Sequence, residues 1–281
     1  MVRRIYIAVF PVLLACGDSG VDVPEPDGGS DAGGDLGPVS ATIGERCPLT
    51  ERVGLVSISE GRVNAFMFDR TDPLIGAPAL TDPSCAFHEY RPAQPCSCSG
   101  DELCGIDGVC TAPPLRATDG RLVLEAAGER QLFTADPTLG DLGGEITLSG
   151  TAFTLEVTAF GQTVTLEQAT EVPGEIASLT ATLTGTYDSP EAIDASWDTF
   201  VSGHVFTHIP INHHAGGATF TECAVDTASG ALRVERPMLE PLAVSTGLEF
   251  QSFDHTRFAA AETARGCVEI RFSSQQFISL F

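Results

Sequence analysis

Apolar and polar side chains alternate along the middle of this chain, and threonine occupies many of the polar positions. Between residues 119 and 187 the alternating apolar positions include Leu122, Leu124, Ile146, Leu148, Phe153, Leu155, Val157, Ala159, Val164, Leu166, Ala177, Leu179, Ala181 and Leu183. A period of two is typical of antiparallel strands that bury one face and leave the other in water. This region is therefore predicted to be a β-sheet.

Shorter apolar runs lie on both sides of this region. Val53 to Ile58 precede a Glu60-Gly61 turn and Val63 to Met67 follow it, which predicts a β-hairpin. Ser189-Pro190 is interpreted as a domain boundary, and Trp197 is expected in the core of the second domain. Strands are expected there near residues 200–209, 218–225, 231–235, 247–253 and 266–272. No segment of useful length predicts an amphipathic helix.

These patterns predict an all-β protein made of two antiparallel β-sandwiches of the Ig-like or Greek-key type. The first sandwich would span residues 45–187 and the second residues 188–281. Trp197 precedes both Cys223 and Cys267, which is not the cysteine-tryptophan-cysteine order of antibody domains. The prediction therefore concerns the architecture and not that family.

The first residues carry a different pattern. Arg3 and Arg4 precede an apolar run from Ile5 to Leu14, which is too short to cross a bilayer as a helix but has the length of a signal-peptide core. The run leads into Leu13-Leu14-Ala15-Cys16, which resembles the lipobox of bacterial lipoproteins. The alternative is an ordinary secretory signal with a chance cysteine, but the position and the flanking residues favour the lipobox.

The resemblance implies that residues 1–15 are a signal peptide and that Cys16 becomes the lipidated first residue. Lipidation would place a diacylglycerol on the sulfur and an acyl chain such as palmitate on the new amino group, and two or more chains give stable membrane anchoring. In Gram-negative families, Asp directly after the cysteine retains the protein at the inner membrane. Here that residue is Gly17, so the outer membrane is favoured and the leaflet stays open.

Residues 16–44 are rich in Gly, Asp, Pro and Ser and contain six acidic residues and no basic one. Such a segment cannot bury enough apolar surface to offset the entropy of ordering, and its charges repel one another. It is predicted to be a disordered acidic linker. The spacing of its aspartates does not match a calcium-binding loop.

The eight cysteines after Cys16 are expected to form disulfide bonds, because their number is even and the chain is exported. Cys223 and Cys267 both lie in strand-like sequence and are predicted to pair with each other. The pairing of the others stays open: Cys47, Cys85, Cys96, Cys98, Cys104 and Cys110. Residues 85–114 are predicted to be a disulfide-rich insert, because the segment is too short for a core of its own. Zinc is the alternative there, but it prefers Cys-x2-4-Cys pairs.

The charge of the chain excludes one class of partner. The formal net charge is -23, and all 15 basic residues are arginine. A chain of this charge repels nucleic acid, so no nucleic-acid partner is expected.

The one concentration of reactive side chains is a group of four histidines within eleven residues, from His204 to His214. On a strand, His204 and His208 share a face but lie about 13 Å apart, too far to bind one ion together. His208, His213 and His214 remain weak metal candidates, with Asp198 or Glu222 as a carboxylate ligand. A polar surface strand is the plainer interpretation, so no metal and no cofactor are assigned.

No recognisable enzyme motif is present: there is no His-Glu-x-x-His, no Gly-x-Ser-x-Gly and no glycine-rich phosphate loop. No catalytic residue is assigned. The sequence favours a lipid-anchored protein of the cell envelope with a role in non-enzymatic recognition or envelope structure. Its partners would be the membrane, through the lipid, and a glycan or protein ligand. The alternative hypothesis is a metal-dependent hydrolase that uses the cluster from His204 to His214.

Overall fold

The computed structural model describes residues 37–280 except 201, 212–217, 244–247 and 249. Residues Asp35–Phe281 form one compact unit. The predicted signal peptide, Cys16 and the linker up to residue 36 lie outside the described residues. Strands make up most of the described chain, so the all-β prediction is confirmed. None of its helices is long and apolar enough to cross a membrane.

A five-stranded sheet holds most of the region where alternation is clearest. Neighbouring strands are antiparallel except for β1, which pairs with β13 in parallel. In spatial order the strands are β1 (Val39–Ser40), β13 (Gln162–Glu171), β12 (Ala152–Ala159), β9 (Arg121–Ala126) and β10 (Glu129–Thr134).

A ten-stranded sheet is the largest element. Its spatial order is β11 (Leu142–Glu145), β4 (Arg62–Met67), β3 (Arg52–Ser59), β20 (Gly266–Ser279), β19 (Phe250–Thr263), β16 (His204–Pro210), β17 (Phe220–Asp226), β6 (Cys85–His88) and β5 (Leu80–Thr81). The tenth strand, β2 (Thr42–Ile43), pairs with β19 outside this path. The predicted hairpin around Glu60-Gly61 is β3–β4, and Gly61 has the positive φ of 74° that such a tight turn favours.

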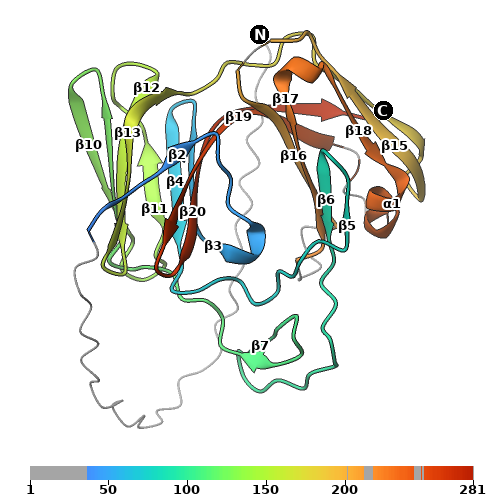
Figure 1. Cartoon of the computed structure of the whole chain (residues 1–281), viewed down its shortest axis with the longest axis horizontal. Coiled ribbons are helices and arrows are strands. Elements are labelled where there is room, and N and C mark those ends of the chain that lie inside the picture. The colour runs from blue at the N-terminus through green and yellow to red at the C-terminus, as the bar shows by residue number, and fades with distance from the viewer. Residues whose placement is uncertain (1–36, 201, 212–217, 244–247, 249, 281) are drawn as a thin grey trace. The chain divides into compact units, whose positions relative to one another are not determined.

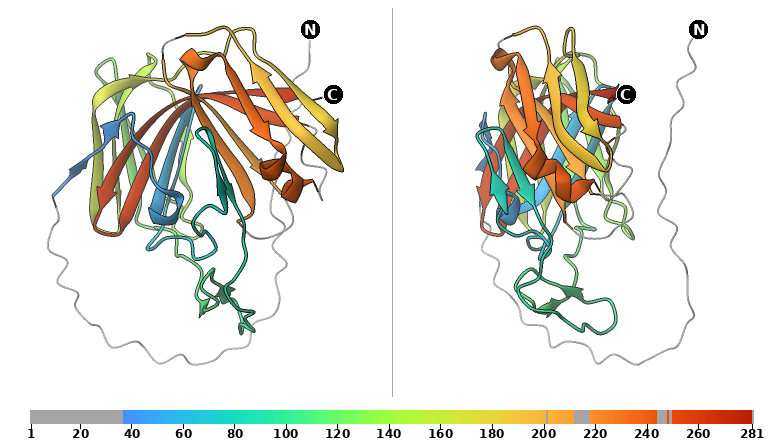
Figure 2. Two further views of the ribbon diagram at one scale, coloured as in Figure 1. Left: turned by 45° about the vertical axis from the view of Figure 1, so that its right-hand side comes forward. Right: turned by 90° about the vertical axis from the view of Figure 1, so that its right-hand side faces the viewer.

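A three-stranded sheet and several short elements complete the fold. The sheet contains β14 (Thr180–Thr186), β15 (Ser189–Ser196) and β18 (Ala231–Glu235). A two-stranded sheet, β7 (Leu103–Cys104) and β8 (Cys110–Thr111), lies in the cysteine-rich insert, which extends away from the other sheets in Figure 2. The helical elements are η1 (Leu49–Glu51), η2 (Thr227–Ser229), α1 (Arg236–Leu239) and η3 (Glu240–Leu242).

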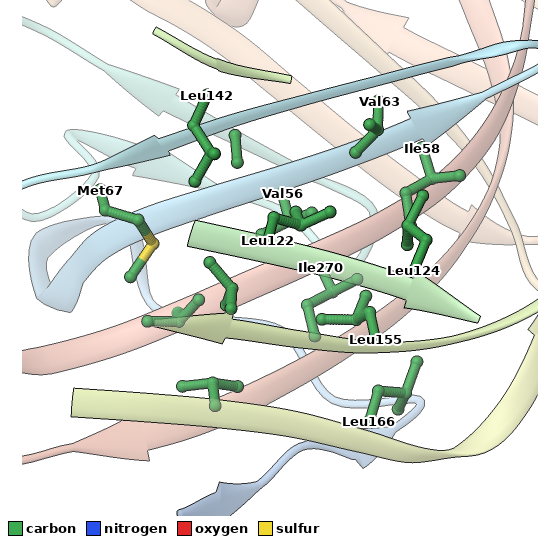
Figure 3. Close-up of a cluster of buried hydrophobic side chains, with 14 of the residues drawn as sticks. Val56, Ile58, Val63, Met67, Leu122, Leu124, Leu142, Leu155, Leu166 and Ile270 are labelled. Carbon is green, nitrogen blue, oxygen red and sulfur yellow. The ribbon is translucent and has the colours of Figure 1, made fainter. Parts of the chain in front are cut away.

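The smaller sheets cover one face of the ten-stranded sheet at two places, which creates two cores. The five-stranded sheet packs on β3, β4 and one half of the β19–β20 hairpin, where Val56, Ile58 and Ile270 are fully buried (Figure 3). The three-stranded sheet packs on β6, β16, β17 and the other half of the hairpin, where Phe253 is buried. Figure 1 shows the two smaller sheets with the β19–β20 hairpin reaching both. The chain thus forms two sandwiches that share one sheet.

The shared sheet changes the predicted domain division. Residues 187 and 188 lie in the turn of the β14–β15 hairpin, whose last pair is Thr186 with Ser189. β20, from the predicted second domain, pairs in parallel with β3 from the first. The two halves therefore belong to one compact unit. Ser189-Pro190 resembled a boundary because a hairpin turn and a linker use the same small and polar residues.

Other local predictions are confirmed or corrected by the structure. Trp197 is buried in the second core, as expected, and its indole nitrogen donates to the Thr227 carbonyl at 2.9 Å. The predicted linker extended to residue 44, but Val39–Ser40 and Thr42–Ile43 are strands β1 and β2. Short extended segments of this kind are stabilised by pairing with an existing strand, which composition alone does not reveal.

The predicted Cys223–Cys267 disulfide is wrong. Cys267 bonds Cys47 and Cys223 bonds Cys85, while the insert contains Cys96–Cys104 and Cys98–Cys110. Cys223 and Cys267 lie on opposite faces of the ten-stranded sheet: Cys223 belongs to the second core and Cys267 packs with Cys47 and Ala260 on the other side. Side chains on opposite faces of a sheet cannot be bridged.

Candidate binding face

The ten-stranded sheet has a second face that neither smaller sheet covers. We call it the free face, and the side that carries the two cores the packed face. Successive side chains of a strand alternate between the two. On β20, Val268, Ile270 and Phe272 lie on the packed face, whereas Glu269 and Arg271 lie on the free face.

A network of five charged side chains crosses the centre of the free face. Glu269 accepts from Arg52 at 3.1 Å and from Arg271 at 2.6 Å, and Glu222 bonds Arg46 at 2.7 Å and Arg271 at 3.4 Å. Glu269 is fully buried, and Glu222 is 7% exposed. Such burial is tolerable only when each charge is paired and hydrogen-bonded, as here. The network joins three segments that are distant in sequence, around Arg46 and Arg52, Glu222, and Glu269 and Arg271.

Two phenylalanines form the floor of this network. The guanidinium carbon of Arg46 lies 4.5 Å from the ring centroid of Phe258, and that of Arg271 lies 4.5 Å from Phe206. Cation–π contacts of this kind are strongest when the cation is desolvated. Phe206 and Phe258 are almost completely buried. The aromatic rings and the carboxylates together hold the arginines in fixed positions.

The segment that carries Arg46 is fastened over the sheet. Cys47 is bonded to Cys267, and its backbone N–H donates to the Glu269 carboxylate at 3.0 Å. η1 follows directly. This cover shields the two carboxylates from water, whereas the Arg46 side chain stays 29% exposed. Burial alone would raise the pKa of Glu222, but Arg271, Arg46 and Arg52 outweigh it and lower that pKa. Burial, together with Arg271, lowers the pKa of Arg52.

The network carries an excess of positive charge: three guanidinium groups face two carboxylates. His88 and His208 lie nearby on either side of Phe220, with ring centroids 5.0 and 4.6 Å from its centroid. Loss of hydration lowers the pKa of both histidines, so both are neutral at pH 7. The network itself is therefore locally positive in a chain whose net charge is -23.

Two hollows lie on either side of η1, and Leu49 lines both. One is a pocket of about 340 Å³ over β3 and β4, called here the apolar pocket. It is lined by Leu49, Arg52, Gly54, Leu55, Phe66, Phe68, Asp72, Leu74, Ile75, Leu103, Pro114 and Arg116. The other is a polar groove of about 500 Å³ that Arg46, Asp82, Ser84, His88 and Glu222 help to line. Both hollows are bounded by the charge network.

The predicted metal candidates are only partly described. His208 lies on the free face with its Nδ1 4.0 Å from Glu222, so one of the two suggested carboxylates does face it. Asp198 lies elsewhere and accepts from Ser178 at 2.6 Å. His213 and His214 lie outside the described residues, so a metal role for them stays a hypothesis.

Among the described residues, the cysteine-rich insert contains the one group of three or more His, Cys, Asp or Glu whose potential metal-ligand atoms all lie within 4.8 Å of one another. The group is Cys96, Cys98 and Cys110. All three sulfurs are in disulfides, with Cys104 completing the second bond of the insert. A zinc ligand must be a thiolate, so the oxidised insert does not offer these sulfurs to a metal.

Comparisons with known proteins give no family. No protein-family model matches the chain, and no curated protein does. Among solved structures, the FN1–FN3 domains of chicken CNTN1 are 10% identical and cover 78% of this chain and 77% of that chain, with a TM-score of 0.20. A TM-score this low supports no argument about fold or function, so the free face must be interpreted from its own geometry.

Neither the arginines of the network nor the apolar pocket is predicted from the sequence. Glu269 and Arg271 alternate with core residues, and such alternation is typical of a strand whose polar side faces water. The sequence does contain a weak indication of the network. Arg46 and Arg52 lie on either side of Cys47, and Glu269 and Arg271 follow Cys267 closely. Charged residues of both signs beside two cysteines that pair would have indicated a shared buried site.

Proposed function

We propose that this protein is a lipid-anchored protein of the cell envelope that binds a ligand, without catalysis, on the free face of its ten-stranded sheet. The observation that carries the proposal is the construction of that face. It is left open by both smaller sheets, yet it holds a fixed charge network and two preformed hollows. Binding sites are usually concave and largely preformed, with few well-placed polar groups.

The anchor rests on the resemblance of Leu13-Leu14-Ala15-Cys16 to a lipobox, and the outer membrane is the favoured location. The four disulfides of the compact unit support export, since such bonds persist in oxidising compartments. A Cys16→Ser variant should stay uncleaved and incorporate no labelled fatty acid. If the variant is processed and labelled like the parent chain, the anchor hypothesis is wrong.

The binding role is tested by thermal unfolding of the oxidised chain from Gly17 to Phe281, which contains the whole compact unit. The ligand panel holds Zn²⁺, Cu²⁺, Ca²⁺, cell-wall glycans, peptides and amphiphilic carboxylates. A ligand at a hundred times its dissociation constant should stabilise the fold by about 2.7 kcal/mol. The variants are Leu55→Trp, on the free face, and Leu132→Trp, on an exposed position of β10, as the matched control.

A ligand shift that Leu55→Trp or Glu222→Gln reduces and Leu132→Trp preserves supports the free face as the binding site. A shift that all variants preserve, or the absence of any shift across the panel, contradicts it. A shift with Zn²⁺ or Cu²⁺ that EDTA reverses would favour the metal hypothesis for His208, His213 and His214.

A further inference from the structure

The apolar pocket is built from parts that the disulfides and turns hold in place. Its floor is the cross-strand pair Leu55 and Phe66 of β3 and β4. Leu74 lies in the loop at one wall, where its backbone N–H donates to the Asp72 carboxylate at 2.9 Å. Leu103 comes from the cysteine-rich insert and forms another wall. Nine of the twelve lining residues are apolar or glycine.

The insert is fixed against this loop. Ile106 donates its backbone N–H to the Pro73 carbonyl at 2.8 Å and its side chain packs against Gly76. The Tyr90 hydroxyl donates to the Cys104 carbonyl at 2.6 Å. These contacts set the position of Leu103, the neighbour of Cys104. The pocket is therefore a preformed cavity, and its volume lies near the lower end of the usual range for small-molecule sites.

Two arginines and Asp72 line this mostly apolar space, and the Asp72 carboxylate accepts the backbone N–H of Leu74. Arg116 lies with its guanidinium carbon 4.8 Å from the ring centroid of Phe66, and it bonds Asp141 at 2.6 Å. Arg52 reaches from the pocket to the charge network. Among the contacts of the described residues, Arg52 uses only Nη1, towards Glu269, so its other guanidinium N–H groups remain as donors.

The charge balance decides which kind of polar group fits beside Arg52. Glu269 is shared by Arg46, Arg52 and Arg271, and within the five-residue network only Glu222 adds a second negative charge. Asp254 interacts with Arg271, but the carboxylates that act on Arg52 are Glu269 and Glu222. Three guanidinium groups therefore face two carboxylates around Arg52, which favours an anionic group there. A carboxylate matches the planar donor pattern of a guanidinium better than other common anions of small size, through two parallel N–H···O bonds.

We propose that the apolar pocket binds a compact apolar carboxylate: an aliphatic or aromatic body enclosed by Leu55, Phe66 and Leu103, with its carboxylate on Arg52. This inference rests on the proposed binding function and names its ligand class. The apolar body gains from leaving water, and the carboxylate gains a charge-assisted hydrogen bond in a site that is already partly dehydrated.

Isothermal titration calorimetry of the oxidised protein from Gly17 to Phe281 tests the proposal with three probes that share the same hydrocarbon length. Octanoate should bind, and octanol should bind about tenfold more weakly, because it lacks the charge that pairs with Arg52. Octylamine, which is a cation at pH 7, should not bind measurably. Using ligands of different charge avoids substituting Arg52, whose loss would disturb the buried network.

The variants locate the site. Leu55→Trp fills the pocket and should weaken octanoate binding at least about tenfold, while Leu132→Trp should leave it within about twofold. The proposal is overturned if octanoate does not bind, if octanol binds as well as octanoate, or if Leu55→Trp binds like the parent. If octanoate fails while another member of the panel binds in a way that the free-face variants reduce, only this ligand class is wrong and the binding function stands.

Discussion

The two faces of the ten-stranded sheet use the same strands in opposite ways. On β20, Ile270 and Phe272 pack under the five-stranded sheet. Glu269, the residue before Ile270, lies on the opposite face and is just as completely buried. On the packed face, burial removes apolar surface from water. On the free face, burial is achieved by pairing charges under a disulfide-bonded cover. Neighbouring residues of one strand are therefore buried by two different kinds of interaction, apolar packing and charge pairing.

The largest effect should come from removing the covalent bond that fastens the cover. Replacing Cys47 and Cys267 together with Ala should lower the free energy of unfolding by about 5 kcal/mol, because the bond closes a loop with a sequence separation of 220. Replacing Cys96 and Cys104, which are separated by 8 residues, should cost about 2.5 kcal/mol or less. Denaturant unfolding measures both. Equal losses would show that the Cys47–Cys267 bond does not constrain the free face as described.

The next effect should come from the buried carboxylate at the centre of the free face. Glu269→Ala should destabilise the protein by about 3–5 kcal/mol, because it leaves arginines buried without their partner. The control is Glu156→Ala, which removes a pair with Arg121 in which both side chains are more than a third exposed. That change should stay within about 1 kcal/mol. A Glu269→Ala loss as small as that of the control would mean that the network contributes no more than a surface pair.

Replacing Asp254, a free-face residue of β19, is expected to have a smaller effect, and to increase the stability of the protein. Burial raises the pKa of Asp254 to about 6, and Arg271 only partly opposes it. The folded state therefore binds this proton more tightly than the unfolded state, so the contribution is favourable at low pH and is lost as the pH rises through about 6.

Asp254→Asn should consequently raise the free energy of unfolding by about 1–2 kcal/mol at pH 7 and change it little at pH 4. Unfolding curves at the two pH values check this, with the exposed Asp188→Asn as a control that should show no such difference. A variant that is less stable than the parent at pH 7 would show that the Asp254 carboxylate is favourably paired.

The packed face was largely predictable from the sequence and the free face was not. Alternation around Leu122, Leu155 and Leu166 indicates strands with one buried side, and these residues do form the first core. The pattern cannot show which strands share a sheet, so it missed that β20 joins β3 and that one sheet serves both sandwiches. Strand pairing over such a sequence distance depends on side-chain contacts that no local period encodes.

The candidate site was harder to predict for a physical reason. Glu269, Arg271 and Arg52 are residue types that usually lie on a solvated surface. Here the Cys47 segment, bonded to Cys267, lies over them and helps to bury them. Metal ligands such as histidine can be recognised in a sequence by residue type, whereas a pocket is defined by its shape in the folded chain. Leu49, Leu74 and Leu103 are ordinary apolar residues that become a pocket lining only because three separate segments of the chain meet there.

Hydrogen exchange of the backbone amides, with and without the ligand that stabilises the protein most, tests directly whether the free face is the binding face. Binding there should slow exchange in residues 66–76 and 103–116, which border the apolar pocket, or in residues 82–88, which border the polar groove, and should leave β9 and β10 unchanged. Protection confined to the five-stranded or three-stranded sheet would contradict it.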